Sequence, residues 1–224
     1  MISIIIPVLN EEKIIKNQLQ QLTALEGDFE LIVVDGGSRD KTPLISKSFA
    51  RVVNSKKGRA IQMNAGAGIA RGDVLFFLHA DCSIEKNALP EIKRIMEQKK
   101  VVGGALSYDV EEDGFLFRNL VYWSRLRAKL TSVYPGDHGL FVRREVFDEV
   151  GGFPHIQLME DIALCKELKK KGRVIHVNSK IFASTRRFEE KGFFRTVLQM
   201  WLNRFLFFIR ISPDRFIGCY RDAR

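Results

Sequence analysis

The sequence is poor in cysteine. It contains only three, an odd number, widely spaced and without a CxxC pair: Cys82, Cys165 and Cys219. This pattern argues against a disulfide scaffold and against a zinc site built from cysteines. It suits a chain that stays in the reducing cytosol.

Long apolar runs and targeting signals are also missing. No stretch reaches the roughly 18 apolar residues of a membrane-spanning helix, and the nearest one, residues 205–209, is bounded by Arg204 and Arg210. The N-terminus, MISIIIPVLNEE, has no basic region before its short apolar stretch, which favours a first strand over a signal peptide. We therefore expect a cytoplasmic protein that does not cross a membrane, and peripheral contact with the inner face of a membrane is left open.

Repeats, low-complexity segments and an interdomain linker are absent as well. With 224 residues, of which 46% are hydrophobic, the chain can form one large domain with a substantial core. The net charge of +9 indicates one of three partners: nucleic acid, an anionic membrane surface or a phosphorylated small substrate. Charge alone does not choose among them.

The C-terminal part mixes arginines with aromatic residues. Trp201, Phe205 and Phe208 recur at helical spacing, with arginines at the margins of the stripe. Such a stripe is compatible with a helix that closes the core and with an interfacial helix seated on anionic lipid. Nucleic-acid binding is the third interpretation, and it is disfavoured because no recognised reading module accompanies the charge.

The first half alternates apolar strands with helical stretches. Residues 2–9, 30–35 and 73–79 are apolar runs, as buried parallel strands are. Between the first two runs, apolar residues return at spacings of four and three, and the same holds after the third run, before a further strand near Val101. This order predicts an α/β fold with a mostly parallel central sheet and helices on both faces.

Polar residues follow three of these strands directly. Asn10-Glu11, Asp35 and Asp81 each stand just after an apolar run. Ligands of such sheets bind beyond the carboxyl ends of the strands, so we expect these residues to share one rim. The alternative is that each caps the helix that follows it.

Two glycine-containing stretches are candidates for binding phosphate or nucleoside. VVDGGSRDKT puts an acid and two glycines between a strand and a helix, where backbone can approach an anion, although it matches neither GxGxxG nor the P-loop. Asp35 could accept hydrogen bonds from a base or ribose. In KKGRAIQMNAG, Lys56, Lys57 and Arg59 could lie near a diphosphate, and a solvated basic loop is the alternative.

Three acids are candidates for metal binding or proton transfer. A carboxylate such as Asp81 at a strand end suits a hard divalent cation, which could bridge the protein to a diphosphate. His79 points to the same side if the strand extends that far. Glu160-Asp161 opens a helix and is either a capping pair or the source of a general base.

With these motifs in chain order, the sequence resembles the family 2 glycosyltransferases, which have the nucleotide-sugar-binding GT-A fold. The resemblance covers about residues 1–170, in the motifs IIIPVLNEE, IVVDGGSRDKT, KGRAIQMNAGA, FLHADC, GDHGLF and LMEDIAL. The tail resembles a subgroup that ends in an arginine-rich strand, a Trp-bearing helix and a SPDRF…YRD segment, some members of which are assigned to arsenosugar biosynthesis.

The resemblance implies a role for each matching residue. A single domain over 1–224 would divide into a nucleotide-sugar half (1–110), an acceptor and catalytic half (111–190) and an aromatic-basic helix with its tail (191–224). Asp161 would be the catalytic base, next to Glu160, and Asp81 the metal ligand. The nucleotide sugar would be bound by Pro7, Asn10, Glu11, Asp35, Gly37, Gly58, Arg59, His79, Ala80, Asp137 and His138.

Two departures from the family pattern refine the expected activity. His79 stands where the family has the first acid of Asp-x-Asp, so ribose or phosphate contact is expected of it. The Gln-x-x-Arg-Trp of processive synthases is replaced by residues 184–188, STRRF, in which Arg187 would assist the leaving group. The resemblance thus implies a non-processive, inverting transferase that uses Mg²⁺ or Mn²⁺, a nucleoside-diphosphate sugar and an acceptor hydroxyl. A nucleotidyltransferase and a non-catalytic sugar-nucleotide-binding or membrane-docking protein are the alternatives.

Overall fold

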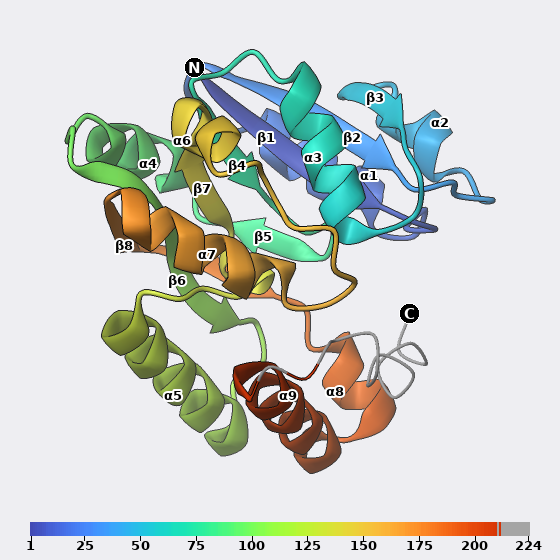
Figure 1. Cartoon of the computed structure of the whole chain (residues 1–224). Helices are drawn as coiled ribbons and strands as arrows, with labels where there is room; N and C mark the ends of the chain where they lie inside the picture. Colours follow the sequence, from blue (N-terminus) through green and yellow to red (C-terminus); the bar gives the residue numbers. More distant parts are fainter. Residues whose placement is uncertain (210, 212–224) are drawn as a thin grey trace.

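A computed structural model of the chain describes residues 1–209 and 211 as an eight-stranded sheet with helices packed on both faces (Figure 1). Cys219 and the SPDRF…YRD segment lie outside the described residues. The strands are β1 (Ile2–Val8), β2 (Phe29–Asp35), β3 (Arg51–Asn54), β4 (Val74–Phe77), β5 (Cys82–Ile84), β6 (Val101–Val110), β7 (Leu140–Arg143) and β8 (Arg173–Ala183). The helices are α1 (Ile15–Thr23), α2 (Thr42–Ser46), α3 (Arg59–Ile69), α4 (Ala88–Met96), α5 (Phe115–Thr131), the 3₁₀ turn η1 (Gly136–His138), α6 (Arg144–Glu149), α7 (Glu160–Lys171), α8 (Arg186–Lys191) and α9 (Phe193–Phe208).

The sheet order is β3-β2-β1-β4-β7-β6-β8-β5. Strands β3, β2, β1 and β4 are parallel neighbours, as the alternating pattern predicts for the first half. Strand β7 runs antiparallel to both β4 and β6, β8 runs parallel to β6, and β5 pairs antiparallel with β8. The predicted α/β class is confirmed, and the second half makes the sheet mixed.

Alternation along the strands divides the core into two layers. In β1, Ile4 and Ile6 face the layer that contains the apolar residues of α1 and α4, whereas Ile5 faces α3, α6 and α7. Helix α3 packs especially close because its small residues leave room. A Cβ at Gly66 would come within 2.4 Å of Ile5 Cγ2 and 2.9 Å of Val34 Cγ2.

Two short edge strands escape sequence-based prediction. Strand β3 has the exposure pattern of an edge and lacks an apolar run, and β5 has only three residues. Strand β4 also ends earlier than the apolar run indicates, at Phe77. His79 and Asp81 therefore lie in the turn between β4 and β5, and strand alternation does not fix their directions.

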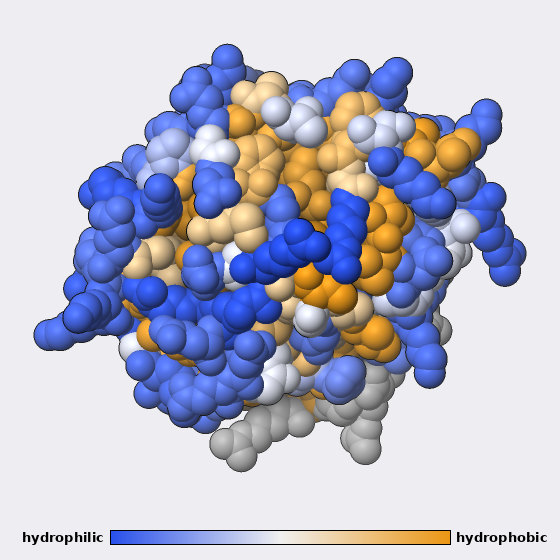
Figure 2. All heavy atoms as spheres, turned by 90° about the horizontal axis from the view of Figure 1, so that it is seen from above, coloured by the Kyte–Doolittle hydropathy of each residue, from blue (hydrophilic) through white to orange (hydrophobic). Residues whose placement is uncertain are grey.

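Helices α5 and α9 lie at the same end of the molecule, away from α3 and α6 (Figure 1). The stripe of α9 is exposed: Trp201 by 63%, Phe205 by 59% and Phe208 by 78%. For these three residues the interpretation of a helix that closes the core is therefore wrong. In the part of the chain that the structure describes, no helix combines the length and apolarity needed to span a bilayer. Seen from above Figure 1, the molecule is bordered by hydrophilic residues, with apolar residues showing near the middle of that face (Figure 2).

Candidate active site

The loops after β1 and β2 are joined by hydrogen bonds at the carboxyl edge of the sheet. Asn10, in the left-handed conformation with φ 56°, donates its N–H to Ser38 Oγ at 2.8 Å, and its Oδ1 accepts the N–H of Arg39 at 2.8 Å. Asp35 is 3% exposed and accepts the N–H groups of Gly37 and Ser38 at 3.1 and 3.0 Å. The loops that carry Asn10 and Asp35 therefore lie together, and the Asp35 carboxylate also stabilises its own turn.

Gln62 holds this rim together, and sequence analysis assigned it no role. Its Nε2 donates to the carbonyls of Val8 and Val34, both at 2.9 Å, which joins the ends of β1 and β2. Its Oε1 accepts the N–H of Gly58 at 3.3 Å, and Gly58 has a φ of 141° that an L residue rarely adopts. The glycine at the start of α3 is therefore fixed next to the two strand ends.

The turn that carries His79 and Asp81 is fixed from behind by Gln18. The buried Gln18 Nε2 donates to the carbonyls of His79 and Cys82, both at 2.8 Å. Ligand atoms of His79, Asp81 and Cys82 lie within 4.8 Å of one another. Ala80, between them, is buried.

The donor set of this turn fits a divalent cation. Asp81 offers an exposed carboxylate and His79 a half-buried imidazole, which together suit Mn²⁺ or Mg²⁺ with diphosphate oxygens as further ligands. Cys82 is the least suited of the three, because its sulfur is a soft ligand whereas Mg²⁺ and Mn²⁺ prefer oxygen. Burial and the charge of Asp81 raise the pKa of its thiol well above the usual value.

Gly136 brings this turn next to Asp161. The Gly136 N–H donates to Asp161 Oδ2 at 2.5 Å. A Cβ at position 136 would lie 2.8 Å from His79 Nε2 and 3.4 Å from Asp161 Oδ2, so a larger residue here would require the His79 ring to shift. Asp161 Oδ1 accepts the N–H of Ile162 at 2.6 Å, within the first turn of α7. The carboxylate thus combines the predicted capping contact with a place beside His79.

Glu160, the neighbouring acid, is engaged elsewhere. Its Oε1 lies 2.9 Å from Arg59 Nε, with side-chain exposures of 2% for Glu160 and 15% for Arg59. The pair joins the N-terminus of α7 to the N-terminus of α3. Arg59 therefore contacts Glu160, which is 101 residues further along the chain.

Asp137 and His138 of η1 lie beside the same centre. The pKa of Asp137 is raised to about 6, mainly by burial and also by the negative charge of Asp161. The positive charge of Arg204 acts in the opposite direction. His138 is 1% exposed and stacks on Tyr108 with ring centroids 5.0 Å apart. Burial holds the pKa of His138 well below its usual value, so its ring is neutral near pH 7.

Two arginines, Arg127 of α5 and Arg204 of α9, complete this group, and sequence analysis assigned neither of them a role in the site. Arg127 Nη1 donates to the Val133 carbonyl at 3.2 Å, while its Nε and Nη2 are buried and have no hydrogen-bond partner among the described residues. Burial and the charge of Arg204 lower the pKa of Arg127 to about 10. Asp137 Oδ1 is likewise buried without a hydrogen-bond partner. Unpartnered donors and an acceptor around one centre are typical of a site that a ligand completes.

The arginines of the STRRF stretch approach the site from α8. Arg186 Nη1 lies 3.9 Å from Glu11 Oε2, next to the loop after β1. Arg187 Nη2 donates to Gln199 Oε1 of α9 at 3.4 Å. Arg186 thus lies beside the loop after β1, and Arg187 contacts α9.

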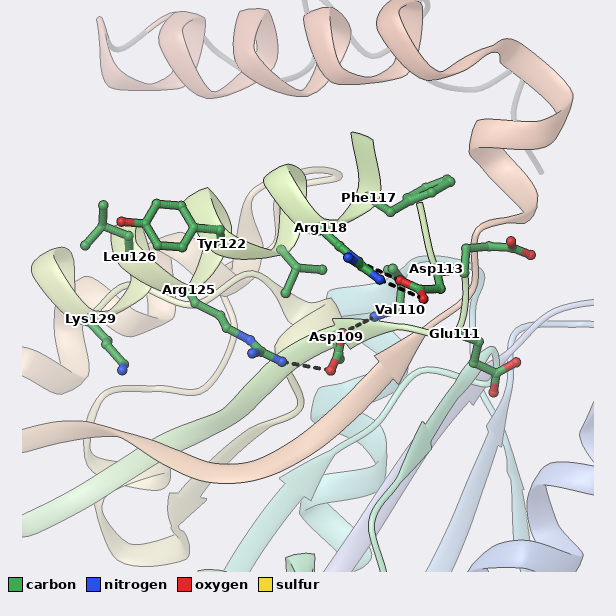
Figure 3. Close-up of a pocket in the computed structure, with 12 residues that line it drawn as sticks. Asp109, Val110, Glu111, Asp113, Phe117, Arg118, Tyr122, Arg125, Leu126 and Lys129 are labelled. Carbon is green, nitrogen blue, oxygen red and sulfur yellow. Dashed lines mark hydrogen bonds and ion pairs between the residues drawn. The ribbon is translucent and has the colours of Figure 1, made fainter. Parts of the chain in front are cut away.

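A cavity of about 530 Å³ lies elsewhere, between the end of β6 and α5 (Figure 3). Ion pairs of Arg118 with Asp113 and of Arg125 with Asp109 cross its wall, with nitrogen–oxygen distances of 2.7 and 2.9 Å. None of the predicted site residues lines it. The candidate active site is instead the open rim described above.

Comparisons with known proteins agree with this geometry. The model of the glycosyl transferase family 2 matches residues 3–151. An undecaprenyl-phosphate 4-deoxy-4-formamido-L-arabinose transferase of Pseudomonas fluorescens is 35% identical over 122 residues, 49% of this chain and 33% of that protein. Glycosyltransferase AglE of Haloferax volcanii is 28% identical over 171 residues, 69% of this chain and 56% of that protein. The chain thus spans between a third and about half of the length of these two relatives.

Solved structures share the fold at low sequence identity. The mannosyltransferase PcManGT of Pyrobaculum calidifontis, in complex with GDP-Man and Mn²⁺, superposes with a TM-score of 0.64 at 20% identity, over 80% of this chain and 56% of that one. Glucosyl-3-phosphoglycerate synthase of Mycobacterium tuberculosis, in complex with Mn²⁺, UDP and glucosyl-3-phosphoglycerate, gives a TM-score of 0.64 at 21% identity, over 86% of this chain and 75% of that one. The fold is therefore that of the GT-A glycosyltransferases. Because the family model covers well over half of its residues, the chain belongs to glycosyl transferase family 2.

Proposed function

We propose that this glycosyltransferase moves a sugar from a nucleoside-diphosphate sugar to an acceptor hydroxyl, with inversion, one transfer at a time. One observation carries the proposal. His79, which is next to the Asp81 carboxylate, and Asp161 both lie against Gly136, so the candidate metal-binding turn and the candidate base are close together.

The donor nucleoside would occupy the edge formed by β1, β2 and α3. Pro7, Asn10 and Glu11 line one side, and Asp35 with Gly37 the other, where the backbone is already ordered by Gln62. Gly58 and Arg59 at the start of α3 would lie near the diphosphate, because a helix N-terminus and a guanidinium both attract anions.

Asp81 would hold Mg²⁺ or Mn²⁺, with His79 close enough to contact the ion or the diphosphate. When bound, the ion neutralises charge on the departing nucleoside diphosphate. Arg187, from α8, would add a second positive charge on that side. The complexes of the two structural neighbours with Mn²⁺ support a divalent metal here.

Asp161 would remove the proton of the acceptor hydroxyl as that oxygen attacks the anomeric carbon. Its two hydrogen bonds to backbone N–H groups fix the carboxylate without using all of its lone pairs. Glu160 would act through Arg59, which it contacts, by holding α7 against α3. Asp137 and the neutral His138 would border the sugar or the acceptor.

The remaining parts of the proposal concern partners and place. The kind of molecule that carries the acceptor hydroxyl is not assigned, and we propose no nucleic-acid partner. We propose a cytoplasmic protein with peripheral contact to an anionic membrane. We also propose a single catalytic domain, within which residues 1–110 bind the donor, and membership of the arsenosugar-type subgroup. The tail motif that suggests this subgroup lies outside the described residues.

Calorimetric titration tests the donor and metal sites together. UDP, GDP and dTDP would each be titrated with and without Mn²⁺ into the wild type, Asp81→Ala and Asp148→Ala. Asp148 is an exposed aspartate of α6 and serves as the matched control. We expect one nucleotide to bind in a metal-dependent manner, with binding lost only in Asp81→Ala. If no nucleotide binds, or if the affinity is the same without Mn²⁺ and in Asp81→Ala, the proposed function is wrong.

A further inference from the structure

Helix α9 exposes a stripe of large apolar side chains, which is unusual for a helix in water. Its outward stripe consists of Phe194, Leu198, Trp201, Leu202, Phe205 and Phe208, each between 52% and 78% exposed. Its buried residues are polar, Thr196 and Asn203. An ordinary surface helix shows the opposite arrangement, and apolar patches of this kind on a protein mark interaction surfaces.

Helix α5 extends the apolar surface. Phe115, Trp123 and Leu130 are 80%, 60% and 77% exposed. The two helices meet where Phe117 of α5 packs edge-on against Phe193 of α9, with ring centroids 5.3 Å apart. The outward stripe of α9 and these three residues of α5 are called the α5–α9 surface below.

The two helices that form this surface carry charges of one sign, whereas the neighbouring α8 also contains Glu189 and Glu190. Neither α5 nor α9 contains an aspartate or glutamate, whereas α5 carries three arginines and a lysine and α9 carries two arginines. Arg195 is the one charged residue of α9 that is fully exposed. Acids that precede α5 are partly neutralised, since Asp113 pairs with Arg118 at 2.7 Å.

Exposed aromatic and leucine side chains on helices whose own charged residues are all basic are typical of helices that lie in a membrane interface. Their apolar face enters the boundary between headgroups and acyl chains, and their basic residues are attracted to anionic lipid. Tryptophan is favoured at this depth because it is apolar with one polar edge. A partner lacking negative charge would leave this basic border unmatched.

We propose that the α5–α9 surface docks the protein on an anionic lipid bilayer. The opposite side of α9 borders the candidate active site, because Arg204 lies near Asp137 and Gln199 accepts a hydrogen bond from Arg187. Docking through the outer face of α9 therefore brings the catalytic centre to the membrane. If the proposed function holds, the acceptor hydroxyl belongs to a membrane-held amphiphile.

The chain contains its own probe for this proposal. It has only two tryptophans, and both, Trp123 and Trp201, lie on the α5–α9 surface. The full chain would be mixed with vesicles of phosphatidylcholine alone or of phosphatidylcholine with phosphatidylglycerol, and intrinsic fluorescence would be recorded. We expect a blue shift with the anionic vesicles, weakened by salt, and quenching by lipids brominated in their acyl chains. Trp123→Phe leaves only the fluorescence of Trp201 in α9, and Trp201→Phe leaves only that of Trp123 in α5, so the two variants show separately whether each helix enters the lipid.

Vesicle co-sedimentation would compare the wild type with Trp201→Gln/Phe205→Gln and with Leu44→Gln. Leu44 is 68% exposed but lies on α2, so it is the matched control. The double variant should bind anionic vesicles at least about tenfold more weakly, and the control should bind as the wild type does. Calorimetry with the nucleotide, or circular dichroism if none binds, would show that the variants are folded.

Three results would overturn the proposal. The first is an absence of fluorescence change and of co-sedimentation with anionic vesicles. The second is equal loss of binding in Leu44→Gln and in the double variant. The third is a dimer in sedimentation velocity that the double variant converts to monomer, which would make a second copy the occupant of the surface. None of these readouts depends on sugar transfer, so failure here is distinguishable from failure of the proposed function.

Discussion

Arg59 and Glu160 form a nearly buried ion pair between two helix N-termini, with 2.9 Å between Arg59 Nε and Glu160 Oε1. Arg59 begins α3, which packs on β1 and β2, and Glu160 begins α7, which carries Asp161 in its first turn. The pair therefore fixes the candidate base relative to the candidate diphosphate site.

Replacing Glu160 by Gln should destabilise the fold. The change leaves the Arg59 guanidinium mostly buried without its countercharge, and breaking such pairs costs several kcal/mol. Because Arg59 retains 15% exposure, we expect a loss of about 2 to 4 kcal/mol in the free energy of unfolding, measured with urea. Glu149→Gln breaks an exposed pair with Lys171 and should cost less than about 1 kcal/mol. Equal losses in the two variants would contradict the structural role of the pair.

Asp161→Asn should abolish most turnover and spare donor binding. The amide oxygen can still accept one of the two N–H bonds that hold the carboxylate, but it cannot take a proton from the acceptor. We expect kcat to fall by about 10²- to 10⁴-fold, measured as release of nucleoside diphosphate. Calorimetry should give nearly unchanged donor affinity. A variant with full turnover would remove Asp161 from the role of base.

Asp137→Asn should stabilise the ligand-free protein above pH 6. Burial raises the pKa of Asp137 to about 6 from 3.8, so between these values the folded state holds a proton that the unfolded state releases. The protonated carboxyl group of Asp137 therefore makes its full contribution to the free energy of unfolding below about pH 4, and this contribution is lost as the pH rises through 6. With 32% side-chain exposure, the gain at pH 7.5 should be about 1 to 2 kcal/mol. The stabilisation by Asp137→Asn should vanish in thermal melts near pH 4. A gain that persists at that pH would contradict the buried charge of Asp137 as its cause.

Arg204→Gln should raise the pKa of Asp137 still further. After burial, Arg204 is the largest influence on that pKa, and it acts by stabilising the carboxylate. Carbon-13 NMR titration of the aspartate carboxyl groups measures the change. Arg195→Gln removes an exposed arginine of the same helix and should leave the titration unchanged. If both variants shift it equally, the effect reflects net charge and not the contact between α9 and η1.

Much of the fold could be predicted from local patterns. The apolar runs that became β1 and β2 and the spacing of Ile15, Leu19 and Leu22 in α1 agree with the structure. Strands β3 and β5 could not be predicted, because an edge strand is stabilised by backbone pairing with its neighbour and needs no apolar run.

The positions of apolar and polar residues along the sequence determined which residues stand at strand ends and helix starts. They therefore placed Asp35, Asp81 and Asp161 among the candidate site residues. The tertiary structure alone decided that His79 and Asp161 both lie against Gly136, that Glu160 pairs with Arg59, and that Arg127 and Arg204 act on Asp137. It also decided that the aromatic stripe of α9 faces outward. The physical reason is that helical periodicity defines a face but not what covers it. Contacts between residues far apart in the chain depend on how the sheet and its helices pack.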